Sequence, residues 1–163
     1  LIIIGLIRGV PGKDVVRSQA EEWMVAALKI CTATAAKAGV KIALEPLNRY
    51  ETPLINTVTQ GLELLEQVGA ENLGLLLDTF HMNIEEPSIE ESIRNCGDRI
   101  FHFHVADSNR WYPGAGHLNF KSILEALQAT GYTGFVSGEF RPDPDANISA
   151  QRALAYLRSL DMQ

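Results

Sequence analysis

The sequence has little cysteine and shows no pattern in the cysteines that it has. Cys31 and Cys96 are the only two among 163 residues, and their spacing is typical of neither a disulfide framework nor a metal site. Both lie in segments with helical periodicity, so we expect two buried, unpaired side chains in a protein from a reducing compartment. The thiols therefore indicate no function.

The sequence is also short of positive charge and of long apolar runs. It contains 14 Lys and Arg residues but 20 Asp and Glu residues, giving a net charge of -6. Nucleic-acid binding needs clustered basic residues, so no nucleic-acid partner is expected. The apolar run at residues 1–7, LIIIGLI, is too short to span a membrane and lacks the charged start of a signal peptide. We therefore expect a cytoplasmic protein, without a membrane partner, that binds small molecules or metal cations.

Apolar runs of strand length alternate with segments of helical periodicity. The runs lie at residues 1–7, 40–44, 73–77, 100–106 and 135–140. The helical patterns lie at residues 14–38, 57–68, 88–96, 120–130 and 148–160. Continuous apolar runs are typical of parallel strands that are buried on both faces, and right-handed crossovers place the helices outside the sheet. No linker interrupts the pattern, so residues 1–163 are predicted to form a single α/β domain.

Two architectures accept this alternation, namely a doubly wound open sheet and a (β/α)8 barrel. An open sheet usually carries a glycine-rich phosphate loop after its first strand, but RGVPG at residues 8–12 is not a G-x-G-x-x-G motif. A barrel usually needs about 250 residues. Five β/α units can therefore form only part of an eight-stranded ring.

Four ligand-type side chains stand at the carboxyl ends of predicted strands: Glu45, Asp78, His104 and Glu139. In a parallel α/β protein these ends share one face, so the four side chains should converge there. Alone, an acid after a strand most often caps a helix. Three clustered carboxylates, however, repel one another unless a cation neutralises them. The pattern predicts a divalent metal site, and one nitrogen with three oxygens suits Mn²⁺, Co²⁺ or Mg²⁺, with Zn²⁺ as an alternative.

Further polar residues follow the same strands. Arg49 and Glu51 come shortly after Glu45, His81 stands three residues after Asp78, and Arg110 stands six residues after His104. Beside a metal, such residues would suit a hydroxylated substrate. Each of the two arginines could meet a substrate carboxylate or pair with a neighbouring acid, so the charge of the substrate stays open. His102 and His104 alternate on one strand, and we expect one of them to face the helices.

Four motifs together resemble a known family: EPLNRYE (45–51), LLLDTFHMNIEE (75–86), FHFHVADSNRWYPGAGH (101–117) and GEF (138–140). They are similar to the xylose-isomerase-like TIM-barrel superfamily of sugar isomerases and epimerases, specifically its ketose 3-epimerase group, and most of all to the 5-keto-L-gluconate epimerase type. The resemblance implies a (β/α)8 TIM barrel of which this chain holds about five C-terminal β/α units, starting at the fourth strand. One departure is Asn119, where relatives often carry Asp.

The resemblance also implies roles for single residues. Glu45, Asp78, His104 and Glu139 would bind a divalent metal, commonly Mn²⁺, and Glu45 and Glu139 would also be the catalytic acid/base pair. The substrate-binding positions would be Glu51, His81 and Arg110. The implied enzyme is a metal-dependent isomerase, an epimerase that inverts the carbon next to the carbonyl of a ketose or keto-uronate through an enediolate.

Alternatives to epimerisation remain at this stage. An aldose–ketose isomerase of the hydroxypyruvate-isomerase kind would use the same metal and the same intermediate, and a related lyase would expel water. The chain could also be a non-catalytic half-barrel. Its first and last strands would then be open sheet edges, which favours pairing between chains, so we expect a homo-oligomer.

Overall fold

The computed structural model of the chain describes residues 1–160. Its five strands form one parallel sheet. The strands are β1 (Ile2–Ile4), β2 (Ile42–Leu44), β3 (Leu73–Asp78), β4 (Ile100–Val105) and β5 (Val136–Gly138). They lie in the order β1-β2-β3-β4-β5, and each is parallel to its neighbours. Strands that are consecutive in the sequence are thus neighbours in the sheet, as in a TIM barrel. The predicted partial barrel is confirmed.

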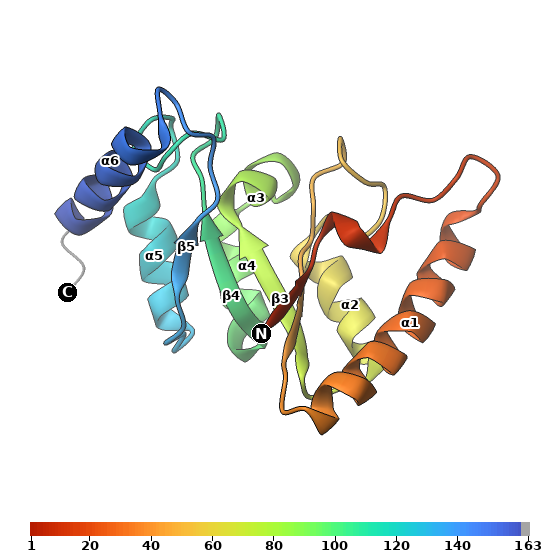
Figure 1. Ribbon diagram of the computed structural model, residues 1–163. Helices are drawn as coiled ribbons and strands as arrows, with labels where there is room; N and C mark the ends of the chain where they lie inside the picture. Colours follow the sequence, from red (N-terminus) through yellow and green to blue (C-terminus); the bar gives the residue numbers. More distant parts are fainter. Residues whose placement is uncertain (161–163) are drawn as a thin grey trace.

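Helices follow the strands in the predicted alternation. They are α1 (Arg17–Lys37), α2 (Val58–Val68), α3 (Thr79–Glu85), α4 (Ile89–Cys96), α5 (Phe120–Ala129) and α6 (Ala146–Ser159). In Figure 1, α2 and α4 lie behind the sheet, while α1 and α6 lie at the two ends of the row of helices. Each predicted helical segment corresponds to one of these helices, although α6 begins two residues before the segment predicted for it. The short α3, directly after β3, was not predicted.

Local signals explain where the helices begin. The side chains of Thr57, Ser88, Asn119 and Asp145 each accept a hydrogen bond from the backbone N–H three residues later, at the start of α2, α4, α5 and α6 respectively. Such N-caps satisfy N–H groups that have no partner inside the helix. Asn119 caps its helix just as an aspartate would, so the departure at this position leaves the start of α5 intact.

The two faces of the sheet carry different side chains. Leu73, Leu75 and Leu77 of β3 join the apolar core under the helices, whereas Leu76 and Asp78 alternate with them and face the other way. This opposite face, away from the helices, carries the polar residues at the strand ends.

The pairing between β3 and β4 contains a register shift. Leu75 pairs with Ile100, but the next pairs are Leu76 with His102 and Asp78 with His104. One extra residue of β4 is thereby accommodated, as in a β-bulge. The shift places His104 directly beside Asp78 on the face away from the helices.

Two further details differ from the sequence-based prediction. The first apolar run is a strand only to Ile4, because Leu6–Arg8 turn into a 3₁₀ helix. Cys96 is buried as predicted, but Cys31 is exposed. The buried residues of α1 recur every four positions at Ala20, Met24, Leu28 and Thr32, and Cys31 lies beside this line rather than on it.

Strands β1 and β5 are the edges of the sheet, and apolar side chains are exposed at both. Ile2 and Ile3 are 54% and 40% exposed, and Phe135 and Val136 are 84% and 41% exposed. None of the helices among residues 1–160 combines the length with the apolar character that a membrane span requires.

Candidate metal centre

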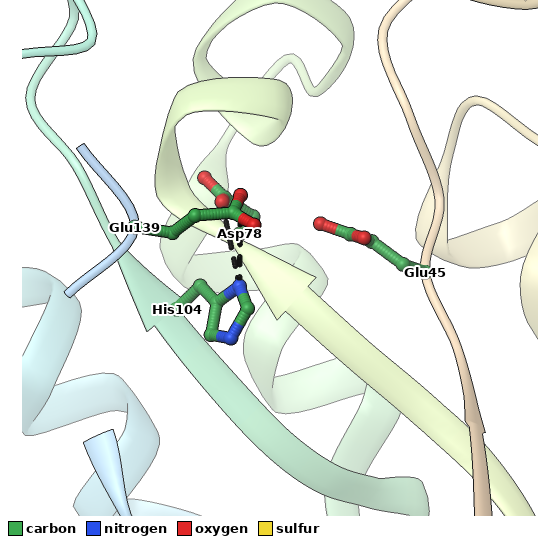
Figure 2. A group of neighbouring side chains, drawn as sticks. All are labelled: Glu45, Asp78, His104 and Glu139. Atoms are coloured by element: carbon green, nitrogen blue, oxygen red, sulfur yellow. Dashed lines mark ion pairs between the residues drawn. The ribbon is translucent and has the colours of Figure 1, made fainter. Parts of the chain in front are cut away.

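The four predicted metal ligands lie together at the carboxyl ends of four strands. Glu45 follows β2, Asp78 ends β3, His104 lies near the end of β4 and Glu139 follows β5. Each offers one ligand atom, and these four atoms all lie within 4.8 Å of one another. Figure 2 shows the four side chains pointing toward a common space, with Glu45 opposite Glu139 and Asp78.

Three atoms of this cluster are buried without a hydrogen-bond partner among the described residues: Glu45 Oε1, Asp78 Oδ2 and His104 Nδ1. His104 Nδ1 lies 3.8 Å from Asp78 Oδ2 and 3.7 Å from Glu139 Oε2, which is too far for a hydrogen bond. Buried polar atoms without partners are costly and rare in folded proteins. A divalent cation among these donors would give all three a partner, so the residues fit a metal ion.

Burial and like charge disfavour ionisation of two of the carboxyl groups. Burial, together with the charges of Asp78 and Glu139, raises the pKa of Glu45 to about 8. Burial likewise raises the pKa of Asp78 to about 7, although the hydrogen bond from the Phe80 N–H acts in the opposite direction. Without a cation, Glu45 therefore keeps most of its proton at neutral pH while Asp78 is near the middle of its titration, and a cation would favour the ionised form of both.

Glu139 and His104 form the opposite case. Pairing with His104 lowers the pKa of Glu139 to about 2, and the Arg110 charge adds to this effect. Burial by itself lowers the pKa of His104, but the attraction of Glu139 and Asp78 outweighs burial and raises it. The cluster thus contains one carboxylate whose ionisation is favoured and two carboxyl groups whose ionisation burial disfavours.

Asp78 has a structural role as well. Its Oδ1 atom accepts a hydrogen bond of 2.7 Å from the Phe80 N–H and so caps α3, while Oδ2 faces the cluster. An acid after a strand most often caps a helix, and Asp78 does so while contributing to the cluster.

The predicted substrate residues Arg110 and Glu51 adjoin the cluster through Glu139. Arg110 Nη1 donates to Glu51 Oε1 at 3.0 Å, and Nη2 lies 3.4 Å from Glu139 Oε2. The guanidinium carbon of Arg110 also lies 4.8 Å from the centre of the Phe80 ring. Sequence reasoning missed Phe80, although it stands inside the motif that contains Asp78 and His81.

His81 lies beside Glu45. It is 1% exposed, and its Nε2 atom is 3.8 Å from Glu45 Oε1. Burial lowers the pKa of His81 to about 4, so its ring is neutral at neutral pH. Arg49, in contrast, is exposed and pairs with Glu85 at 2.9 Å.

The two histidines of β4 correct one expectation. The ring centroids of His102 and His104 lie 5.0 Å apart, so both rings occupy the same face of the sheet. The expectation that one of them faces the helices is wrong, because side chains two positions apart on a strand share a face.

Comparisons with known proteins agree with the partial barrel. A family model described as the xylose isomerase-like TIM barrel matches residues 2–160. L-ribulose 3-epimerase from Mesorhizobium japonicum is 36% identical over 156 residues, which span 93% of this chain and 52% of that protein. 3-Dehydro-D-guloside 4-epimerase from Escherichia coli is 35% identical over 133 residues, which span 81% of this chain and 51% of that protein.

A solved structure is similar as well. The crystal structure of D-psicose 3-epimerase with D-tagatose, from Clostridium cellulolyticum, is 31% identical and superposes with a TM-score of 0.87, covering 98% of this chain and 63% of that chain. The present chain spans about half the length of the curated relatives named here.

Proposed function

The chain belongs to the xylose isomerase-like TIM barrel family, and from this premise we propose that it carries the metal and acid/base centre of a ketose 3-epimerase. The observation that supports the proposal most strongly is the cluster of Glu45, Asp78, His104 and Glu139, whose ligand atoms lie within 4.8 Å of one another. Relatives that match most of this chain are named as sugar epimerases, which supports the same class of reaction.

We propose Mn²⁺ as the metal, with Co²⁺, Mg²⁺ and Zn²⁺ as alternatives. Three carboxylate oxygens and one imidazole nitrogen form a donor set that suits Mn²⁺, and thiolates, which would select softer metals, are absent from the cluster. A bound divalent cation would supply positive charge beside the oxygens of the sugar and so reduce the cost of forming an enediolate.

Glu45 and Glu139 would carry out the proton transfers. Inversion at the carbon next to a carbonyl requires removal of a proton from one face and delivery of a proton to the other. The two carboxyl groups lie on opposite sides of the cluster, as Figure 2 shows, and approach it from β2 and β5. Because the reverse reaction follows the same path backwards, each glutamate acts as the base in one direction and as the acid in the other.

Arg110, Glu51 and His81 would bind the hydroxyl groups of the substrate. Arg110 is already paired with Glu51 and Glu139, and Arg49 is paired with Glu85. Neither arginine is left to balance a substrate carboxylate. We therefore propose an uncharged ketose rather than the keto-uronate that the 5-keto-L-gluconate epimerase type would use.

Incubation of the Mn²⁺-loaded chain with D-psicose or L-ribulose in deuterated water tests the proposal. The expected products are the sugars inverted at C3, with deuterium at that carbon. Loss of turnover is expected in Glu45→Gln and in Glu139→Gln, and full activity in both variants would contradict their roles. An aldose product would instead identify an aldose–ketose isomerase. Deuterium exchange of 5-keto-L-gluconate but not of the neutral ketoses would overturn the proposed substrate class.

Four predictions from the sequence concern the protein as a whole. The homo-oligomer is tested by the size of the chain in solution against its mass of 17.9 kDa. A cytoplasmic location and the lack of nucleic-acid or membrane partners stay predictions from composition. So does the single domain at residues 1–163, of which residues 161–163 lie outside the described part.

A further inference from the structure

Asn48 is a buried residue that contacts His81 twice. Its backbone nitrogen lies 3.2 Å from His81 Nδ1, and its side-chain Nδ2 lies 2.8 Å from the same atom. Asn48 is 2% exposed and His81 is 1% exposed. Water therefore does not compete for Nδ1, and the protein groups around this atom determine which of the two ring nitrogens carries the proton.

The orientation of the Asn48 amide is fixed by two neighbours, one of which can only donate a hydrogen bond and the other only accept one. Its Oδ1 atom lies 3.0 Å from the backbone nitrogen of Tyr50, which can only donate. Its Nδ2 atom lies 3.2 Å from Glu51 Oε1, and an ionised carboxylate can only accept. The NH₂ end of the amide, and not its oxygen, therefore faces His81.

Both neighbours of His81 Nδ1 are thus hydrogen-bond donors, so Nδ1 has to accept. A neutral imidazole that accepts at Nδ1 carries its proton on Nε2. This Nε2 atom is buried without a partner among the described residues, and Glu45 Oε1 stands 3.8 Å from it. The Nε2–H group is therefore free to donate to an oxygen atom that enters the site beside Glu45.

We propose that Asn48 is a positioning residue that holds His81 in the Nε2–H tautomer and so makes it a hydrogen-bond donor to a bound sugar oxygen. The nature of the ligand rests on the proposed function, whereas the tautomer does not. The same amide donates to Glu51, which in turn accepts from Arg110. One asparagine therefore fixes two groups at the candidate substrate site.

Nitrogen NMR tests the tautomer directly. The metal-free chain, labelled with ¹⁵N in its histidines, is examined at neutral pH by long-range ¹H–¹⁵N correlation, and a His81→Gln variant assigns the signals. We expect an unprotonated Nδ1 and a protonated Nε2 in the wild-type ring. A proton on Nδ1 would overturn the proposal, and this wild-type result decides even where a variant fails to fold.

Asn48→Asp provides the second test, because it puts an acceptor of nearly the same shape beside Nδ1. Protonation of Nδ1 is the expected change, and unchanged His81 signals in a folded variant would contradict the positioning role. If the wild-type chain turns over a ketose, we also expect KM to be about tenfold higher in Asn48→Asp, which corresponds to a loss of about 1.4 kcal/mol of binding free energy.

Asn56→Ala is the matched control. Asn56 lies in the same loop and donates to the carbonyl oxygens of Leu47 and Thr52 at 2.7 and 2.8 Å. Its removal disturbs the loop without changing the groups at His81 Nδ1, so the tautomer should persist. An equal change of the His81 signals in this variant would show that Asn48 acts only through the loop. Absence of metal binding or turnover would contradict the proposed function but leave the NMR result intact.

Discussion

Gly5 lies directly against the carboxylate of Glu45. A β-carbon at position 5 would stand 2.7 Å from Glu45 Oε2, closer than such atoms approach one another. The pairing of β1 with β2 causes this proximity, since the Glu45 N–H donates to the carbonyl oxygen of Ile4 at 3.0 Å. The missing side chain at Gly5 therefore provides the space that the Glu45 carboxylate occupies.

Replacing Gly5 by alanine should displace that carboxylate and weaken metal binding. Outer contacts that orient metal ligands typically change affinity by about 10-fold to 100-fold, and we expect a loss in this range for Mn²⁺ by calorimetric titration. Gly12→Ala is the control, because a β-carbon there would meet nothing within 4 Å. Equal Mn²⁺ affinity in both folded variants would refute the steric explanation.

Two substitutions at Asp78 should separate its cap from its role in the cluster. Asparagine keeps an oxygen that can accept from the Phe80 N–H, whereas alanine loses the cap, at a cost of about 1 kcal/mol. Asp78→Asn should therefore stay more stable than Asp78→Ala in urea unfolding of the metal-free chain. Both should lose tight Mn²⁺ binding, and retention of wild-type affinity by either variant would remove Asp78 from the metal site.

The stability of the metal-free chain should fall as the pH rises from about 5 to about 8. The folded-state pKa values of Glu45 and Asp78, about 8 and about 7, lie above their ordinary values of 4.5 and 3.8. Through these two groups the folded chain binds more protons than the unfolded chain within this window, and its stability decreases with pH. His81, whose pKa is lowered to about 4, opposes this decrease only below its ordinary value of 6.5. The pKa of Glu139 is lowered to about 2, so the stabilisation that this carboxylate contributes is lost only when the pH falls below its ordinary pKa of 4.5.

Thermal unfolding in a chelator at the two pH values measures this effect. A change of about 1 kcal/mol corresponds to roughly 2–4 °C in Tm for a chain of this size, and a decrease of at least this much is expected at the higher pH. Mn²⁺ should abolish the decrease, because a cation favours the ionised groups, and Glu45→Gln should reduce it. A Tm that rises with pH in the chelator would show that burial does not control these carboxyl groups.

Arg110 should tolerate glycine better than alanine. Its backbone adopts φ of 61°, a left-handed conformation that costs an L-residue about 1–2 kcal/mol and glycine very little. Arg110→Gly and Arg110→Ala both lose the bridge between Glu51 and Glu139, so comparing them isolates the backbone. We expect Arg110→Gly to be more stable by about 1 kcal/mol in urea unfolding, and the reverse order would contradict the strained loop.

The fold and the members of the cluster followed from local patterns. The run that became β3 is continuous and apolar, and the run that became β4 is interrupted only by His102 and His104, so their assignment did not depend on any distant contact. Asp78 and Glu45 could be placed together because the carboxyl ends of parallel strands share one face. The short α3 was not predicted because its seven residues, Thr79–Glu85, continue from β3 without an intervening loop.

Contacts between distant segments could not be predicted in the same way. No sequence pattern indicates that Asn48 and His81 are in contact. Only the packing of the loop after β2 against α3 places Asn48 Nδ2 2.8 Å from His81 Nδ1. The bridge from Arg110 to Glu51 likewise joins residues 59 positions apart. Each of these contacts depends on loop geometry, for which hydrophobic periodicity carries no signal.

The sequence by itself determined the order of the β/α units and the approximate positions of the strand ends, because both follow from periodicities of two to four residues. Only the tertiary structure decided how those residues act. Burial raises the pKa of Glu45, the fold pairs Arg110 with Glu139, and Asn48 sets the proton on His81. These properties arise from distances and solvent exclusion between segments far apart in the chain, which the linear pattern does not contain.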